Sequence, residues 1–313
     1  MPDRRLLGLA AAALAAAVAF LAIGLKGNIA FVLELRLVKL AALVQVGVAI
    51  AISTVIFQTV TGNRILTPSI MGLDALYLFG QMLMVFLLGG VGYVTLDPQM
   101  KFGLEVLVLM ALASALLLPM LKSRLDMGLM LLAGVVFGVL FRSLHSLLAR
   151  LIDPNEFSVV QSASFANFNA VRTDLLVFAA IVTVIAAVIA WRARHVLDII
   201  SLGPDTATGL GVGWAGTVTG LLLLVSALVA VSTALVGPVA FFGLLVAALA
   251  ERIVDTRRHG VLLPAAALAG IVVLVGGQTL FQHALGNATA LGVVIEFVGG
   301  LVFLLLLVLG SRK

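Results

Sequence analysis

Apolar stretches of about 20 residues recur along the whole chain, and this pattern constrains the fold more than any other feature. An α-helix needs about 20 apolar residues to cross the roughly 30 Å of hydrocarbon in a bilayer. Only helices and closed barrels satisfy their backbone hydrogen bonds there, and stretches of this length favour helices. Only 11% of the 313 residues are charged, against about 25% in soluble proteins. The sequence therefore predicts an all-α, polytopic membrane helix bundle.

We expect about ten spans in a single transmembrane domain that covers residues 1–313. The eighth of these spans is short. The predicted spans are 6–25, 37–60, 71–94, 103–121, 128–148, 174–191, 215–235, 238–250, 262–283 and 291–310.

Basic residues indicate the orientation of the chain. With the N-terminus inside, the inner segments hold twelve of the 19 Lys and Arg residues, and the outer or outward-leaning segments hold seven. Cytoplasmic loops carry an excess of Lys and Arg, so both termini are expected in the cytoplasm. The first apolar run, Leu6 to Leu25, is longer than the ~7–15 residues of a signal-peptide core. We interpret it as the first span, and cleavage stays open as the alternative.

A proline divides the longest apolar block, which runs for 36 residues from Ala215 to Ala250. This block is too long for one crossing and marginal for two. Proline lacks an amide hydrogen, disfavours helix in the residue before it, and suits the first turn of a helix. We therefore predict a break at Gly237 and Pro238, with a short helix that begins at Pro238.

Two predicted inner loops are unusual. The loop near 195–212 is amphipathic, and Gly203-Pro204 divides it into two short pieces, with Asp205 as the expected N-cap of the second. The loop from Glu251 to Pro264 is dense in charge. Taken alone, either loop is also compatible with a solvated connection.

One outer segment, Ala149 to Asp174, is too polar to span and carries Phe157, Phe165 and Phe168 among Ser and Asn. Aromatic residues on a polar segment are typical of helices that lie at the membrane interface. We expect a surface helix that covers the bundle.

Several kinds of chemistry are excluded or disfavoured by what the sequence lacks. The chain has no cysteine, which excludes disulfides and thiolate metal sites. No phosphate-binding GxxxxGK[ST] sequence and no nucleophile elbow occurs. His145, His195, His259 and His283 are scattered without paired spacing, so no metal site is expected. We expect no catalytic residue, no ATP hydrolysis by this chain and no nucleic-acid partner.

Ionisable residues within spans suggest function, because a charge in the bilayer is costly. Asp74 and Glu105 lie near span ends, where capping or snorkelling is expected. Arg142 and His145 lie three residues apart and are expected on one helix face. This pair could attract an anionic solute in a cavity, or it could pack against polar backbone or a headgroup. Glu296 could pair with Arg142 or line a pore.

The order of motifs resembles the FecCD family, the permease subunits of bacterial ABC importers for iron-siderophores, haem and vitamin B12. The resemblance runs from about Leu35 to Leu309. The most telling stretches are "LRLVKLAALVQVGVAIAISTVIFQTVTGNRILTPSIMGLDA" (35–75), "LDIISLGPDTATGLGV" (197–212), "GPVAFFGLLVAALAERIVDTRRHGVLLPAAALAG" (237–270) and "LGVVIEFVGGLVFLLLL" (291–307).

Some family motifs are altered in this chain. Arg36-Leu37-Val38-Lys39 stands where the family has Arg-Leu-Pro-Arg, and the loop from Asn63 to Pro68 lacks the first proline of Asn-Pro-Leu-Ala-x-Pro. Ala247-Ala248 replaces a Pro-His pair. These departures place the chain on a divergent branch of the family.

The resemblance implies a type II ABC importer permease in the bacterial cytoplasmic (inner) membrane. It implies a second permease subunit, either another copy or a different chain, with the transport path at the interface. It also implies two cytoplasmic ATPase subunits, which would hold the ATP, and an extracytoplasmic binding protein. This chain would bind no cofactor of its own and would contact membrane lipid.

The resemblance and the charges together give candidate residues for each role. The ATPase-coupling candidates are Leu202, Gly203, Asp205, Gly209, Leu210, Gly211, Glu251, Arg252, Asp255 and Arg257. The binding-protein docking candidates are Arg36, Lys39, Arg150 and Arg172, and the substrate-path candidates are Arg142, His145 and Glu296.

Other functions remain open at this stage. An ion-coupled secondary transporter can also have ten helices and a broken span, but it needs carboxylates near the midplane, where only Glu296 is suitable. An intramembrane enzyme lacks a nucleophile or metal cluster. Within the importer interpretation, a ferric siderophore is the expected substrate, with haem and cobalamin as alternatives.

Overall fold

The structure is a computed structural model, and it describes residues 2–25, 28–122, 127–161, 166–168, 171–284, 292 and 294–301. All regular structure in these ranges is helical, and a helical stretch over 294–301 follows the last labelled helix. The elements are α1 (Pro2–Ala22), α2 (Ile29–Thr61), η1 (Ser69–Leu73), α3 (Asp74–Thr95), α4 (Pro98–Lys122), α5 (Met127–Leu151), α6 (Pro154–Gln161), α7 (Thr173–Arg192), α8 (Arg194–Ile200), α9 (Pro204–Gly209), α10 (Trp214–Val236), α11 (Phe242–Val254) and α12 (His259–Ala284).

Eight helical segments of the described chain are long and apolar enough to cross a membrane. They are α1, α2, η1 with α3, α4, α5, α7, α10 and α12. This result confirms the all-helical membrane fold. The two remaining predicted spans differ: 238–250 corresponds to the 13-residue α11, and most of 291–310 lies outside the described residues.

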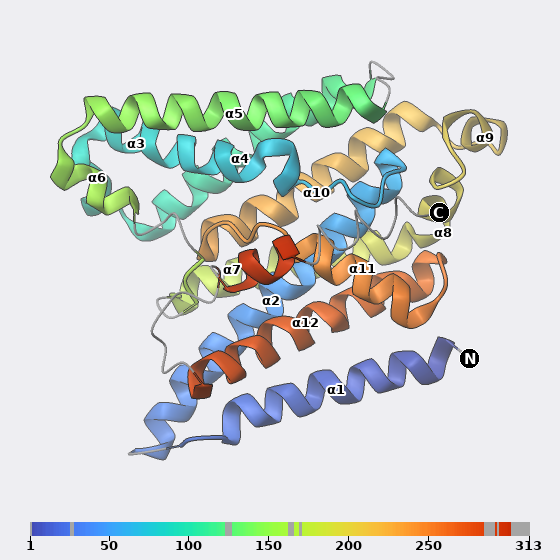
Figure 1. Cartoon of the computed structure of the whole chain (residues 1–313), viewed down its shortest axis with the longest axis horizontal. Coiled ribbons are helices and arrows are strands. Elements are labelled where there is room, and N and C mark those ends of the chain that lie inside the picture. The colour runs from blue at the N-terminus through green and yellow to red at the C-terminus, as the bar shows by residue number, and fades with distance from the viewer. Residues whose placement is uncertain are drawn as a thin grey trace.

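Helix α2 lies at the centre of the bundle, where it contacts α7, α10, α11 and α12 (Figure 1). In its apolar stretch 78% of the residues are buried, against 17% for α1 and 11% for α5. Figure 1 shows α1 and α5 along opposite edges of the bundle, with α1 against α12 and α5 against α3. The two edge helices therefore present most of their surface to whatever surrounds this subunit.

The centre is held together by close backbone packing of α2 on α12. A Cβ atom built on Gly270 would lie 2.5 Å from the carbonyl oxygen of Gly47, so no larger residue fits without movement of a helix. Small residues of this kind drive helix association in lipid, where apolar burial gives little advantage. Gln45 adds a polar contact, because its Nε2 donates to Thr183 Oγ1 of α7 at 2.9 Å.

The structure breaks the long apolar block at the predicted place but starts the next helix later. Helix α10 ends at Val236, and Gly237 follows with a φ of 99°. The prediction that a helix begins at Pro238 is wrong, since α11 begins at Phe242. Tertiary contacts explain the longer connection: a Cβ on Gly299 would lie 2.7 Å from Phe241 Cβ, so the 294–301 helix packs directly against this turn.

The predicted inner loop does form two short helices, α8 and α9, separated at Gly203, whose φ is 94°. The predicted N-cap is wrong. Gly203 is the N-cap of α9 and Pro204 is its first residue, so Asp205 lies within the first turn. Proline is preorganised for the first helical position, so the N-cap lies two residues before the predicted position.

The outer segment contains the surface helix α6, which packs on α3. The Glu156 Oε1 atom accepts a hydrogen bond of 2.8 Å from the backbone N–H of Gly90, next to the break of α3 at Gly89. Phe157 packs against a small buried cluster and Phe168 is buried, whereas Phe165 lies outside the described residues.

Candidate functional site

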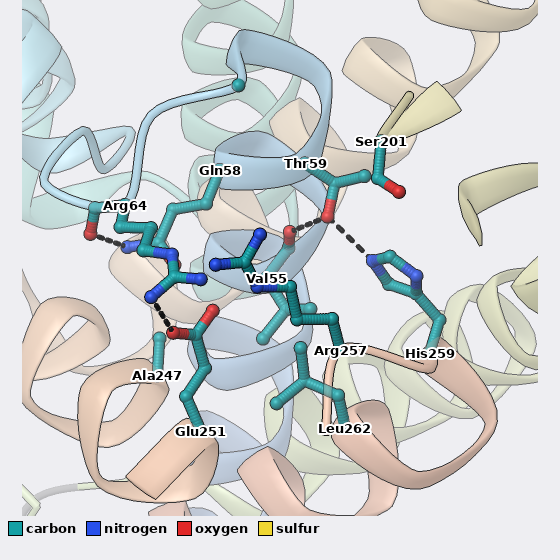
Figure 2. Close-up of a pocket in the computed structure, with 11 residues that line it drawn as sticks. Val55, Gln58, Thr59, Arg64, Ser201, Ala247, Glu251, Arg257, His259 and Leu262 are labelled. Carbon is teal, nitrogen blue, oxygen red and sulfur yellow. Dashed lines mark hydrogen bonds and ion pairs between the residues drawn. The ribbon is translucent and has the colours of Figure 1, made fainter. Parts of the chain in front are cut away.

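A polar pocket of about 110 Å³ lies between the ends of α2, α8, α11 and α12 (Figure 2). Arg64 and Glu251 form an ion pair across it, with 3.2 Å between Nη1 and Oε2. The turn after α2 positions Arg64, because Gln58 Nε2 donates to the Arg64 carbonyl at 2.5 Å. Figure 2 shows Arg257 turned toward the same space as Arg64. The pocket therefore gathers cationic side chains from two segments far apart in the sequence.

His259 connects three helices at this pocket. Its Nδ1 atom lies 2.7 Å from Asp198 Oδ1 on α8, and its backbone N–H donates to the same oxygen at 2.8 Å. Its Nε2 atom lies 2.7 Å from Thr59 Oγ1 on α2. His259 is 2% exposed. The first residue of α12 thus ties the helix pair α8–α9 to the centre of the bundle.

Sequence reasoning did not select His259, Asp198 or Thr59, because the histidines were judged only by metal-ligand spacing. The signal that was available is that Asp198 and His259 lie in the two unusual inner loops, 195–212 and 251–264. In the described residues no three His, Asp or Glu side chains form a metal-binding cluster.

The coupling candidates fall into two groups. Leu202 and Leu210 are 57% and 58% exposed, and they flank α9 together with exposed Asp205, Gly209 and Gly211. Buried Ala207 anchors α9 to its neighbours.

The second group lies at the end of α11. Glu251 and Arg257 line the pocket, whereas Arg252 and Asp255 are exposed beside it. Arg5 of α1 donates to the carbonyl of Ile253 at 2.9 Å, so the start of α1 lies at this same end of the bundle.

The four docking candidates have different surroundings. Arg36 is 8% exposed, and its Nη1 and Nη2 donate to four carbonyls at the end of α1, from Phe20 to Gly24, at 2.7–3.1 Å. Lys39 is half-buried, and Arg150 is exposed. Arg172 is bound to Asp174 at 3.0 Å, and this hydrogen bonding raises the pKa of Arg172. Of the four, Arg36 is already occupied as a cap of α1.

The path candidates do not form the expected cationic pair. Arg142 is exposed, whereas His145 is half-buried with Nδ1 3.2 Å from the Leu78 carbonyl of α3. Residues three apart on a helix differ by about 60° in direction, enough to turn one outward and the other toward a neighbour. Glu296 is half-buried beside the backbone N–H of Ala240, and no ion pair joins it to Arg142 in the described structure.

A polar cluster between α3 and α4 also escaped prediction. Glu105 is buried and accepts a hydrogen bond from the Tyr93 hydroxyl at 3.2 Å, so its expected role as a cap or snorkelling residue is wrong. Tyr93 also donates to Gln81, and Lys101 Nζ lies 3.7 Å from the centre of the Tyr93 ring. The spacing of four between Lys101 and Glu105 was the available signal.

Comparisons with known proteins agree with this architecture. The FecCD transport family model matches residues 26–309. The petrobactin import system permease protein YclO of Bacillus subtilis is 43% identical over 288 residues, which cover 92% of this chain and 91% of that protein. The petrobactin import system permease protein FatC of Bacillus anthracis is 32% identical, with coverages of 87% and 77%.

The fold also matches a solved structure, described as an inward-facing conformation of a metal-chelate type ABC transporter. The TM-score is 0.84 at 22% identity, and the match covers 98% of this chain and 99% of that one. ATP hydrolysis in such transporters belongs to a separate subunit, so this chain is not an enzyme. The chain belongs to the FecCD transport family of ABC transporter permeases.

Proposed function

We propose that this chain is one permease subunit of an ATP-driven importer that moves a ferric siderophore across the bacterial inner membrane by alternating access. Its relatives named above are petrobactin import permeases that match most of its length. Haem and cobalamin are the competing substrates within this proposal. The assembled importer would contain a second permease, two cytoplasmic ATPase subunits that bind the ATP, and an extracytoplasmic binding protein.

The observation that carries this proposal is the exposed helix pair α8–α9 and its attachment to the bundle. Leu202 and Leu210 expose apolar surface on a polar loop, which favours contact with another protein. We assign this contact to the ATPase. A displacement of α8 would then move α12 and α2 as well, because His259 of α12 binds both Asp198 of α8 and Thr59 of α2.

Transport follows from differential binding of the ATPase to two states of the permease. Closure of the ATPase pair on ATP would push α8–α9, and the packed helices would move as rigid bodies. Helix α11 is separated from α10 by the connection at Gly237 to Phe241, so it can shift without moving α10. Glu251, Arg252, Asp255 and Arg257 at its inner end would respond to the same push.

A double variant tests this coupling role in the reconstituted importer. Asp205→Trp with Gly209→Trp should lower substrate-stimulated ATP turnover roughly tenfold, about 1.4 kcal/mol, because both exposed positions would meet the ATPase. Gly103→Trp is a matched control, since a Cβ at Gly103 meets nothing within 4 Å and α4 begins at the opposite end. If substrate stimulates ATP turnover normally in the double variant, α8–α9 does not couple the permease to the ATPase.

Substrate and energy source are tested by uptake into vesicles. We expect ATP-dependent uptake of iron-59 presented as ferric petrobactin, and no uptake of haem or cobalamin. Uptake driven by an ion gradient without the ATPase would contradict the importer proposal and favour a secondary carrier.

A further inference from the structure

The C-terminal half of α5 exposes two arginines and two serines, whereas the other exposed residues of this helix are apolar. Val139, Arg142, Ser143, Ser146, Leu147 and Arg150 line an open concavity of about 430 Å³. The exposed residues of the inner half are apolar, including Leu129, Leu132, Val135 and Val136. A helix that faced lipid along its whole length would not expose arginines among its apolar residues.

The guanidinium of Arg142 lies far from both ends of α5, so it would lie deep in the bilayer if this helix crosses it. Arg142 stands nine residues before Leu151, the last residue of α5, which is about 13 Å along the helix. A Cβ on Gly138 would lie 3.4 Å from Arg142 Nη2, so the side chain extends toward the preceding turn and not toward the outer surface. A snorkelling arginine would extend the other way to reach headgroups.

No described acidic side chain forms an ion pair with Arg142. A charge at this depth that is neither paired nor snorkelling is unfavourable in lipid. The groove must therefore face water or another protein in the assembled transporter. The transport path proposed above, between this permease and a second one, supplies such surroundings.

We infer that Arg142 is a specificity-determining residue of the path and favours anionic iron chelates, with Arg150 nearer the outer mouth. This inference rests on the proposed function. Iron(III) held by catecholate dianions keeps a net negative charge, whereas iron(III) with a full set of hydroxamate monoanions is neutral. A guanidinium in a site shielded from bulk water attracts the first class and gives no such advantage to the second.

The absence of native cysteine in this chain allows a test that needs no substrate. Ser146→Cys places a thiol one turn from Arg142 in the complete importer. Its rates of reaction are measured with an anionic and a cationic methanethiosulfonate of similar size, by mass analysis of this chain. Arg142→Gln in the same background should lower the ratio of anionic to cationic rate roughly three- to tenfold. Arg192→Gln, an exposed arginine at the end of α7, should leave the ratio unchanged.

The outcomes separate this inference from the proposed function. If the Ser146→Cys thiol reacts but Arg142→Gln does not alter the ratio of anionic to cationic rate, Arg142 does not select for charge. The proposed transport path along α5 would still hold in that case. Failure of both reagents in the assembled importer would overturn the path along α5 itself. Uptake gives a second readout: Arg142→Gln should reduce ferric petrobactin uptake roughly tenfold while Arg142→Lys keeps most of it, and equal uptake by the two variants would contradict the inference.

Discussion

At the scale of single residues, the two ring nitrogens of His259 bind two different helices. A substitution can remove one of these two hydrogen bonds and keep the other. The Nδ1 side of His259 faces Asp198 of α8 and its Nε2 side faces Thr59 of α2. Asparagine places an amide near the first position, and glutamine places one near the second. Each substitution therefore keeps one partner.

We expect His259→Gln to reduce substrate-stimulated ATP turnover more than His259→Asn does, because only the asparagine keeps a side-chain hydrogen bond to Asp198 of α8, whereas the backbone N–H of residue 259 donates to Asp198 in both variants. The lost hydrogen bond involves a carboxylate and is worth about 1.5–3 kcal/mol, so a difference of roughly tenfold in turnover is expected. Turnover of the two variants is compared in the reconstituted importer. Equal losses would mean that His259 only stabilises the fold.

The residues also show what the sequence can and cannot predict. Arg142 was selected because charge in a span is rare, and the structure leaves it exposed in a groove. His145 was paired with it by spacing, but helix periodicity does not say which neighbour lies on each side, and α3 binds His145 instead. Arg36 is predicted to dock the binding protein from its charge and its predicted outer position, whereas the carbonyls it caps belong to a helix whose position only the tertiary structure defines.

At the scale of elements, the crossing of α2 and α12 depends on the absence of two side chains. Gly270→Val should separate these helices, because the nearest atom to an added Cβ is backbone. Overpacking of this kind costs about 1–3 kcal/mol. The thermal midpoint of the purified permease should fall, whereas Gly276→Val on the same helix, where a Cβ meets nothing within 4 Å, should change it little. Equal midpoints would show that the helices can separate without loss of stability.

The helices themselves were largely predictable, because length and apolar composition fix where a chain can cross a bilayer. The break after Val236 was predictable as well, since proline acts locally. The start of α11 was not, because the turn at Phe241 is shaped by the 294–301 helix, which lies more than fifty residues further along the chain.

At the scale of the whole molecule, six candidate spans, α1, α2, α3, α4, α5 and α7, separate the start of the chain from α8. An even number of crossings returns the chain to its starting side, and Figure 1 shows the start of α1 on the same side as α8 and α9. We expect single cysteines at Arg4 and Thr206 to react with an impermeant thiol reagent only in inside-out vesicles. A cysteine at Met100, exposed at the start of α4, should react only in right-side-out vesicles. Any other pattern would contradict cytoplasmic placement of the N-terminus.

The cap that Arg36 provides for α1 bears on how the chain is assembled during synthesis. Helix α1 enters the bilayer first, yet the long helix that it packs against, α12, is made more than two hundred residues later. Among the described residues, the side chain translated before α12 that binds these last carbonyls of α1 is Arg36, which follows them by 12 to 16 residues. We therefore expect the α1–α2 hairpin to hold α1 in place while the rest of the bundle is translated.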